Sequence, residues 1–182
     1  MVTFFSFLNK SLKRLLILLP LIVGLICNPI SANALYPSDP SSVDVLKEDL
    51  HGKDLQNTEY VKYDLSGQDL GEANLQGAYM SVTTAKNASF KGANMKDLIA
   101  YATRFDNADL SDANLTNGEL MKSVFDGANI DGADFTDANL DLKTRKSLCE
   151  RATGTNSQTG VNTFDSLECS GLKGYTPPKP KA

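Results

Sequence analysis

Residues 108–117 read Ala108-Asp109-Leu110-Ser111-Asp112-Ala113-Asn114-Leu115-Thr116-Asn117, a five-residue pattern written twice. The pattern runs without a slip from Leu50 to Leu140. Every fifth residue counted from Leu50 is the large position, and seventeen of these nineteen residues are large and apolar. Two residues earlier is the small position, which from Ala73 onward is small almost throughout; two residues later is the turn position, commonly Gly, Asn or Asp. A repeat this regular determines the architecture of its segment.

The five-residue period fits neither regular element, because a helix repeats its face every 3.6 residues and a strand every two. The period instead predicts a short extended piece followed by a tight turn. Large and small positions lie two residues apart, so both point inward, and Gly, Asn and Asp serve the turn. Four turns close a square coil of 20 residues, and coils stack about 4.8 Å apart. The sequence therefore predicts an all-β solenoid of nearly five coils over residues 48–142.

The repeats also carry a family resemblance. Ala73-Asn74-Leu75-Gln76-Gly77, Ala113-Asn114-Leu115-Thr116-Asn117 and Ala138-Asn139-Leu140 match the A-(D/N)-L-x-x pattern of pentapeptide-repeat proteins. The resemblance implies a right-handed quadrilateral parallel β-helix. Together with the export signal and the cysteine-containing tail described below, the chain resembles the thylakoid-lumenal or periplasmic pentapeptide proteins of cyanobacteria and chloroplasts. That family brings no settled activity or active site.

Residues 1–34 have the pattern of a cleaved Sec-type signal peptide. A basic stretch, Lys10 to Arg14, precedes an apolar run from Leu15 to Ile26, and Ala32-Asn33-Ala34 forms an A-x-A cleavage site. We expect cleavage between Ala34 and Leu35, export to the thylakoid lumen or periplasm, and no stable membrane insertion afterwards. The alternative is an uncleaved anchor, although the run is shorter than the ~20 residues that span a bilayer.

Two cysteines remain after the predicted cleavage, Cys149 and Cys169. An even pair in an oxidising compartment predicts a disulfide, which would stabilise the fold by roughly 3 kcal/mol by closing a loop of about 20 residues. The alternative is a pair of buried free thiols. We expect no metal site, because the spacing is far from Cys-x-x-Cys and the one histidine is remote.

Short helices are expected at both ends of the solenoid. In the N-terminal segment, residues 35–47, Ser42 is a candidate cap for a helix from Val43 to Asp49. In the C-terminal cap, residues 143–172, Thr144 is the expected N-cap of a helix reaching about Ala152, and a second helix is expected near residues 163–167. The C-terminal helices should cover the last coil, and the Pro- and Lys-rich residues 173–182 are expected to be disordered. The large residues that we expect to be covered are Phe125, Ile130, Phe135 and Leu140.

Composition argues against two classes of function. After cleavage the chain carries 15 bases against 22 acids, so it lacks the basic patch that binds nucleic acid. With His51 as the one histidine, a catalytic triad has one possible base, and that residue is expected to be solvated. Paired carboxylates should lie on a convex surface with no cleft to shift their pKa. We expect no enzyme, no cofactor, no metal and no catalytic residue.

A binding face is a more plausible functional site. In the 20-residue register, the outward residues Tyr79, Ile99, Tyr101 and Met121 gather on one side, whereas outward residues elsewhere are mostly polar. Such a patch can mark an interaction site for a protein partner or a second copy. The alternative is incidental exposure with local repacking, because Leu98 and Ala100 swap large and small roles there. A second functional hypothesis is an acidic, DNA-mimicking inhibitor of a DNA-binding enzyme, which export argues against.

Overall fold

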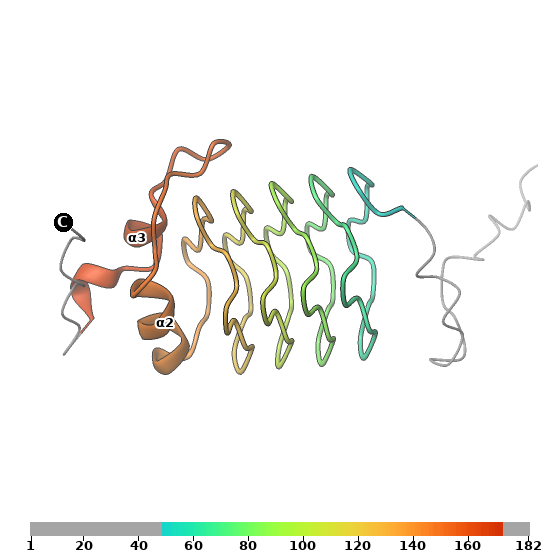
Figure 1. The fold of residues 1–182 in the computed structure, drawn as a ribbon, viewed down its shortest axis with the longest axis horizontal. Helices are drawn as coiled ribbons and strands as arrows, with labels where there is room; N and C mark the ends of the chain where they lie inside the picture. Colours follow the sequence, from blue (N-terminus) through green and yellow to red (C-terminus); the bar gives the residue numbers. More distant parts are fainter. Residues whose placement is uncertain (1–48, 173–182) are drawn as a thin grey trace, which may run out of the picture. The chain divides into compact units, whose positions relative to one another are not determined.

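The computed structural model describes residues 49–172, and their backbone forms a stack of four-sided coils (Figure 1). Parallel bridges join residues 20 apart in the sequence, for example Ser89 to Asp109 and Asp109 to Asn129. This confirms the predicted register. Each extended piece is a single bridged residue, because the chain turns again within five residues. The described coils are therefore held by ladders of isolated bridges and contain no longer strand.

One repeat shows why the sequence folds this way. Leu110 N donates to Asn129 O in the following coil at 2.8 Å, and Ala113 N donates back to Leu110 O at 3.1 Å to close the corner. The Asp109 carboxylate accepts from Ser111 N at 3.0 Å, which fixes the entry to the corner. Asp112, at the turn position, has a φ of 61°, a conformation that Asp tolerates better than most residues. Extended piece and corner then repeat.

The core is a set of vertical columns inside the coils. Large residues such as Leu70, Leu110 and Leu115 are fully buried, and Ala at the small positions fills the space between them. Four phenylalanines pack in series toward the C-terminal end, with ring centroids 5.1–6.3 Å apart. They are Phe90, Phe105, Phe125 and Phe135.

The C-terminal cap consists of helix α2 (Leu142–Cys149), helix α3 (Thr163–Ser166) and the 3₁₀ turn η2 (Cys169–Gly171). The predicted N-cap at Thr144 is wrong. Asp141 is the N-cap, and its carboxylate accepts from Thr144 N at 3.0 Å and from Thr144 Oγ1 at 2.7 Å. The helix therefore begins earlier than expected and ends at Cys149 rather than Ala152. The second helix lies where it was predicted.

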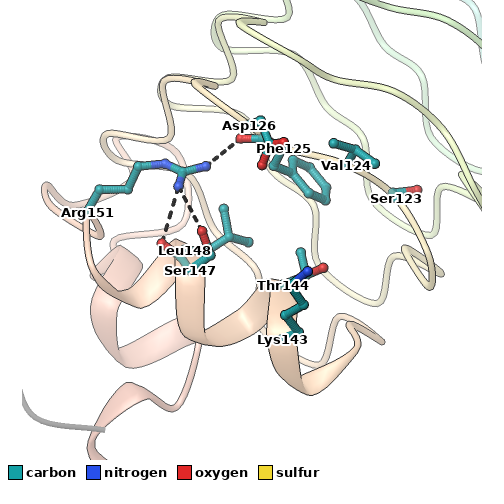
Figure 2. Close-up of a pocket in the computed structure, with 9 residues that line it drawn as sticks. All are labelled: Ser123, Val124, Phe125, Asp126, Lys143, Thr144, Ser147, Leu148 and Arg151. Carbon is teal, nitrogen blue, oxygen red and sulfur yellow. Dashed lines mark hydrogen bonds between the residues drawn. The ribbon is translucent and has the colours of Figure 1, made fainter.

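The cap closes the last coil through polar and apolar contacts. Leu148 and Leu167 are buried. Ser166 Oγ accepts from Phe135 N at 3.0 Å. Half-buried Arg151 donates to Phe125 O at 2.5 Å (Figure 2). It also donates to Ala128 O at 3.3 Å, taking the place of the next-coil amide that Ala108 O has in Asn129 N. A disulfide joins Cys149 of α2 to Cys169 of η2 with a Cα–Cα distance of 5.6 Å.

Between α2 and α3 lies a hairpin that the sequence did not predict, residues 153–162, bridged between Thr155 and Asn162. Its buried Asn156 donates from one side-chain amide to three backbone carbonyls of the coils, at 2.9–3.2 Å. Gln158 reaches Gly92 O at 2.9 Å. The hairpin thus straps the corners of several successive coils.

Several expectations lie outside the described residues. They are the signal peptide, cleavage after Ala34, the N-terminal helix from Val43, and the state of residues 173–182. Within residues 49–172, no helix is long and apolar enough to cross a membrane.

Candidate protein-interaction face

The structure brings together the four outward residues predicted from the register, Tyr79, Ile99, Tyr101 and Met121, here called the tyrosine face. A bridge joins Tyr79 to Ile99, and Ala102 N donates to Met121 O at 3.0 Å, which holds the next column in step. Tyr79 is 46% exposed and Tyr101 is 41% exposed, while Ile99 and Met121 are half-buried. The face is therefore an apolar surface with two aromatic rings partly open to solvent.

Val82 extends the face, and sequence reasoning missed it. It is 53% exposed, more than either tyrosine. It occupies a turn position, which was interpreted as a corner residue and not as part of a surface. The available signal was its residue type: β-branched Val stands where most other corners have Gly, Asn or Asp.

The corner beside the tyrosine face carries ordinary side chains in the left-handed backbone region. Lys62, Val82, Ala102 and Lys122 have φ of 64°, 60°, 54° and 61°. Left-handed backbone costs an L-residue roughly 1–2 kcal/mol, and it is least suited to a β-branched one. Non-glycine residues persist in such conformations where the surrounding structure holds them.

A ladder of buried hydroxyls stabilises this corner. Thr83, Thr103 and Ser123 take the small positions directly after this corner, and all three are buried. Thr83 donates to Tyr60 O, Thr103 to Met80 O, and Ser123 to Ala100 O, each to the preceding coil. Ser123 Oγ also accepts from Thr103 N at 2.9 Å. The other columns of small positions are mostly Ala, so this corner has hydrogen bonds that the others lack.

The swap of Leu98 and Ala100 does not disturb the coil. Both side chains are fully buried. The ladder passes from Tyr79 to Ile99 and on to Glu119 without a break. Leu98 fills the small position, and Ala100 at the neighbouring large position leaves room for it. Exposure of the tyrosine face is thus a feature of an intact coil and not of a distorted one.

Charged side chains flank the face. Lys122 Nζ lies 5.1 Å from the centre of the Tyr101 ring, and hydrogen bonding to Tyr101 raises the pKa of Lys122, so the cation is retained. The Glu119 carboxylate accepts from the Asn139 amide at 2.8 Å. Lys62 is exposed in the first coil. An apolar centre with charges on its rim is a common composition for a protein interface.

The one histidine, His51, lies in an exposed polar pair of the first coil. His51 Nδ1 lies 3.2 Å from Asp69 Oδ2, with both side chains about half exposed or more. The pKa of Asp69 is lowered, first by the hydrogen bond from Gly71 N and then by His51, which stabilises a carboxylate and does not prepare a general acid. Within residues 49–172 there is no group of three or more His, Cys, Asp or Glu placed to hold a metal ion.

Comparison with known proteins identifies the repeats. The model of the family described as pentapeptide repeats matches residues 64–97 and 103–141 with eight copies. The chain belongs to the pentapeptide-repeat family. Proteins of this family are right-handed quadrilateral β-helices, in agreement with the 20-residue spacing of the bridges.

Two of the similar proteins come from the thylakoid lumen of Arabidopsis thaliana. Thylakoid lumenal protein TL20.3 of Arabidopsis thaliana is 58% identical over 43 residues, which are 24% of this chain and 15% of that protein. A crystal structure of a pentapeptide repeat protein from the Arabidopsis thaliana thylakoid lumen is 32% identical and covers 66% of this chain and 91% of that one, with a TM-score of 0.28. QnrB1, a plasmid-mediated fluoroquinolone resistance protein, is 17% identical over 50% of this chain and 67% of its own, with a TM-score of 0.23.

Proposed function

We propose that this pentapeptide-repeat protein is a non-enzymatic interaction module of the thylakoid lumen, and that it binds protein through the tyrosine face. The observation that carries the proposal is that Tyr79, Val82 and Tyr101 gather on one side of the coils. Among the described residues, the other exposed large apolar side chain is Leu142, at the start of α2. Exposed aromatic and aliphatic side chains are the residues that anchor protein interfaces. The scaffold we propose has nearly five coils over residues 48–142, capped by residues 143–172.

The rigidity of the coil suits this role. Every coil is bridged to its neighbours, and the hydroxyl ladder of Thr83, Thr103 and Ser123 fixes the corner beside the face. A surface held in place before binding loses little conformational entropy on binding. Turn positions along the solenoid share a left-handed backbone, but Val82 is the β-branched residue among them. Because β-branched residues are strained in that conformation, its presence supports a role for the side chain on the surface.

The lumenal location is supported by two observations. Residues 1–34 have the composition of an export signal ending at Ala34, and two similar proteins belong to the Arabidopsis thaliana thylakoid lumen. None of the comparisons supports the periplasm. The DNA-mimic hypothesis gains nothing from QnrB1, since a likeness at that identity concerns the fold alone.

The proposal is tested by a matched pair of baits incubated with a thylakoid lumen extract. One carries Tyr79→Ser, Ile99→Ser and Tyr101→Ser; the control carries Asn94→Ser and Asn114→Ser on another face. We expect the wild-type chain and the control to retain the same protein, and the triple variant to lose it. Equal retention by all three baits would show that the tyrosine face does not bind it.

A further inference from the structure

The charges around the tyrosine face follow a pattern that no single contact explains. Three vertical columns run through the same four coils. The glutamate column is Glu59, Tyr79, Ile99 and Glu119. The central column is Val61, Ser81, Tyr101 and Met121. The lysine column is Lys62, Val82, Ala102 and Lys122.

Both outer columns have charged ends and an apolar middle. The glutamate column is bridged from Glu59 through Tyr79 and Ile99 to Glu119, so its acids lie three coils apart. The lysine column is held in the same step by backbone hydrogen bonds such as Lys62 N to Ser81 O at 3.1 Å. All four charged residues are exposed. The acids lie on one side of the central column and the bases on the other.

This pattern is self-complementary under one symmetry. If two copies meet with a two-fold axis parallel to the coil stack, each coil faces its own counterpart and the order of the columns reverses. The glutamate column then faces the lysine column of the second copy, so Glu119 meets Lys122 and Glu59 meets Lys62. With the axis perpendicular to the stack, Glu59 would instead face Glu119 and Lys62 would face Lys122. Like charges placed opposite each other disfavour that alternative.

We propose that the partner of the tyrosine face is a second copy of this chain, docked side by side with both coil stacks pointing the same way. The inference rests on the proposed function, since it names the protein that this face binds. The central columns meet at the axis, with Tyr101 against Tyr101 and Ser81 against Ser81. Four Glu–Lys pairs frame the apolar centre. One face of four coils is small beside the ~800 Å² per partner of a standard interface, so the association is weak and reversible.

Charge reversal tests the arrangement in sedimentation experiments on residues 35–182, which include every described residue. Glu119→Lys and Lys122→Glu each reverse two pairs and should weaken self-association about tenfold. The double variant restores opposite charges across the axis and should recover most of the loss. Glu72, at a turn position with a φ of 57°, shows that glutamate is accommodated where Lys122→Glu places it. Glu72→Lys, on another corner, changes the net charge by the same amount as Glu119→Lys; it is the control for that variant and should leave self-association unchanged.

A cysteine at the axis gives a second measurement. Ser81→Cys should cross-link two copies under mild oxidation, whereas Ser111→Cys, equally half-buried and also one residue after a large position, should not. A chain that stays monomeric at every concentration overturns the inference, as does stronger association of Glu119→Lys or failure of the double variant to recover. The proposed function would survive each of these outcomes if the wild-type bait retained a different protein and the tyrosine-face variant lost it.

Discussion

Replacing Val82 with Asn should make the β-helix more stable while weakening its association. Val82 is β-branched with a φ of 60°, whereas Asn87 and Asn107 occupy equivalent turn positions at φ of 56° and 55°. Relief of the left-handed backbone is worth roughly 1–2 kcal/mol. Against this, Val82 is 53% exposed, so the substitution forfeits about half of a valine's burial, on the order of 0.7 kcal/mol. The expected net gain is about 0.3–1.3 kcal/mol.

Urea unfolding with the disulfide intact measures this gain. With a urea dependence of about 2 kcal/mol per molar, the midpoint should rise by about 0.2–0.6 M. Asn87→Val is the reciprocal control: it introduces the same strain at an exposed turn position on another corner and should cost about 1 kcal/mol. Val82→Asn should also weaken self-association, so a higher protein concentration should be needed for half-association. Asn87→Val should leave that concentration unchanged. A lower urea midpoint for Val82→Asn would refute the reasoning, since Val82 would then be stabilising the fold by packing.

Three further substitutions test the corner and the cap. Thr103→Val removes the buried hydroxyl bound to Met80 O and should cost about 1 kcal/mol in urea unfolding; no loss would mean that the hydroxyl ladder does not stabilise the corner. Arg151→Met should cost about 2 kcal/mol, because it leaves Ala128 O unpaired and removes the charged donor to Phe125 O, whereas Arg104→Met, at an exposed site, should stay within about 0.5 kcal/mol; equal effects would contradict the capping role. The hydrogen bond from Thr144 N lowers the pKa of Asp141 below its ordinary 3.8, so its stabilisation is present above about pH 4 and lost as pH falls through the folded pKa. Asp141→Asn keeps the N-cap acceptor but does not titrate, so acid titration of its stability should show a smaller loss than wild type.

The repeat could be predicted because one physical requirement recurs along it. Each large position must be buried and each corner must turn, so a register assigned at Leu110 holds at Leu70 and Ile130. The tyrosine face follows from that register, because residues 20 apart must be neighbours. The disulfide was predicted from the even cysteine count of a chain expected to be exported, and the structure has it.

The features that escaped prediction depend on single contacts outside the period. The hairpin at 153–162 is held by the Asn156 amide on coil carbonyls, and no spacing in the sequence indicates which carbonyls are open. Asp141 is the N-cap of helix α2, because its carboxylate accepts hydrogen bonds from both the backbone N–H and the hydroxyl of Thr144, three residues later. Val82 was overlooked because turn positions were interpreted by conformation alone, although their side chains also form a surface.

Face, corner and cap all depend on the 20-residue coil, and a pair of engineered cysteines tests it directly. Ser89 and Asp109 are bridged neighbours, so the double variant Ser89→Cys/Asp109→Cys places two Cα atoms about 4.8 Å apart, within the range of a disulfide. Ser89→Cys/Asn114→Cys, 25 residues apart, places the second thiol on an adjacent side. We expect the first pair to form an intramolecular disulfide under mild oxidation and the second to remain as free thiols. Cross-linking of the second pair in preference to the first would contradict the four-sided coil.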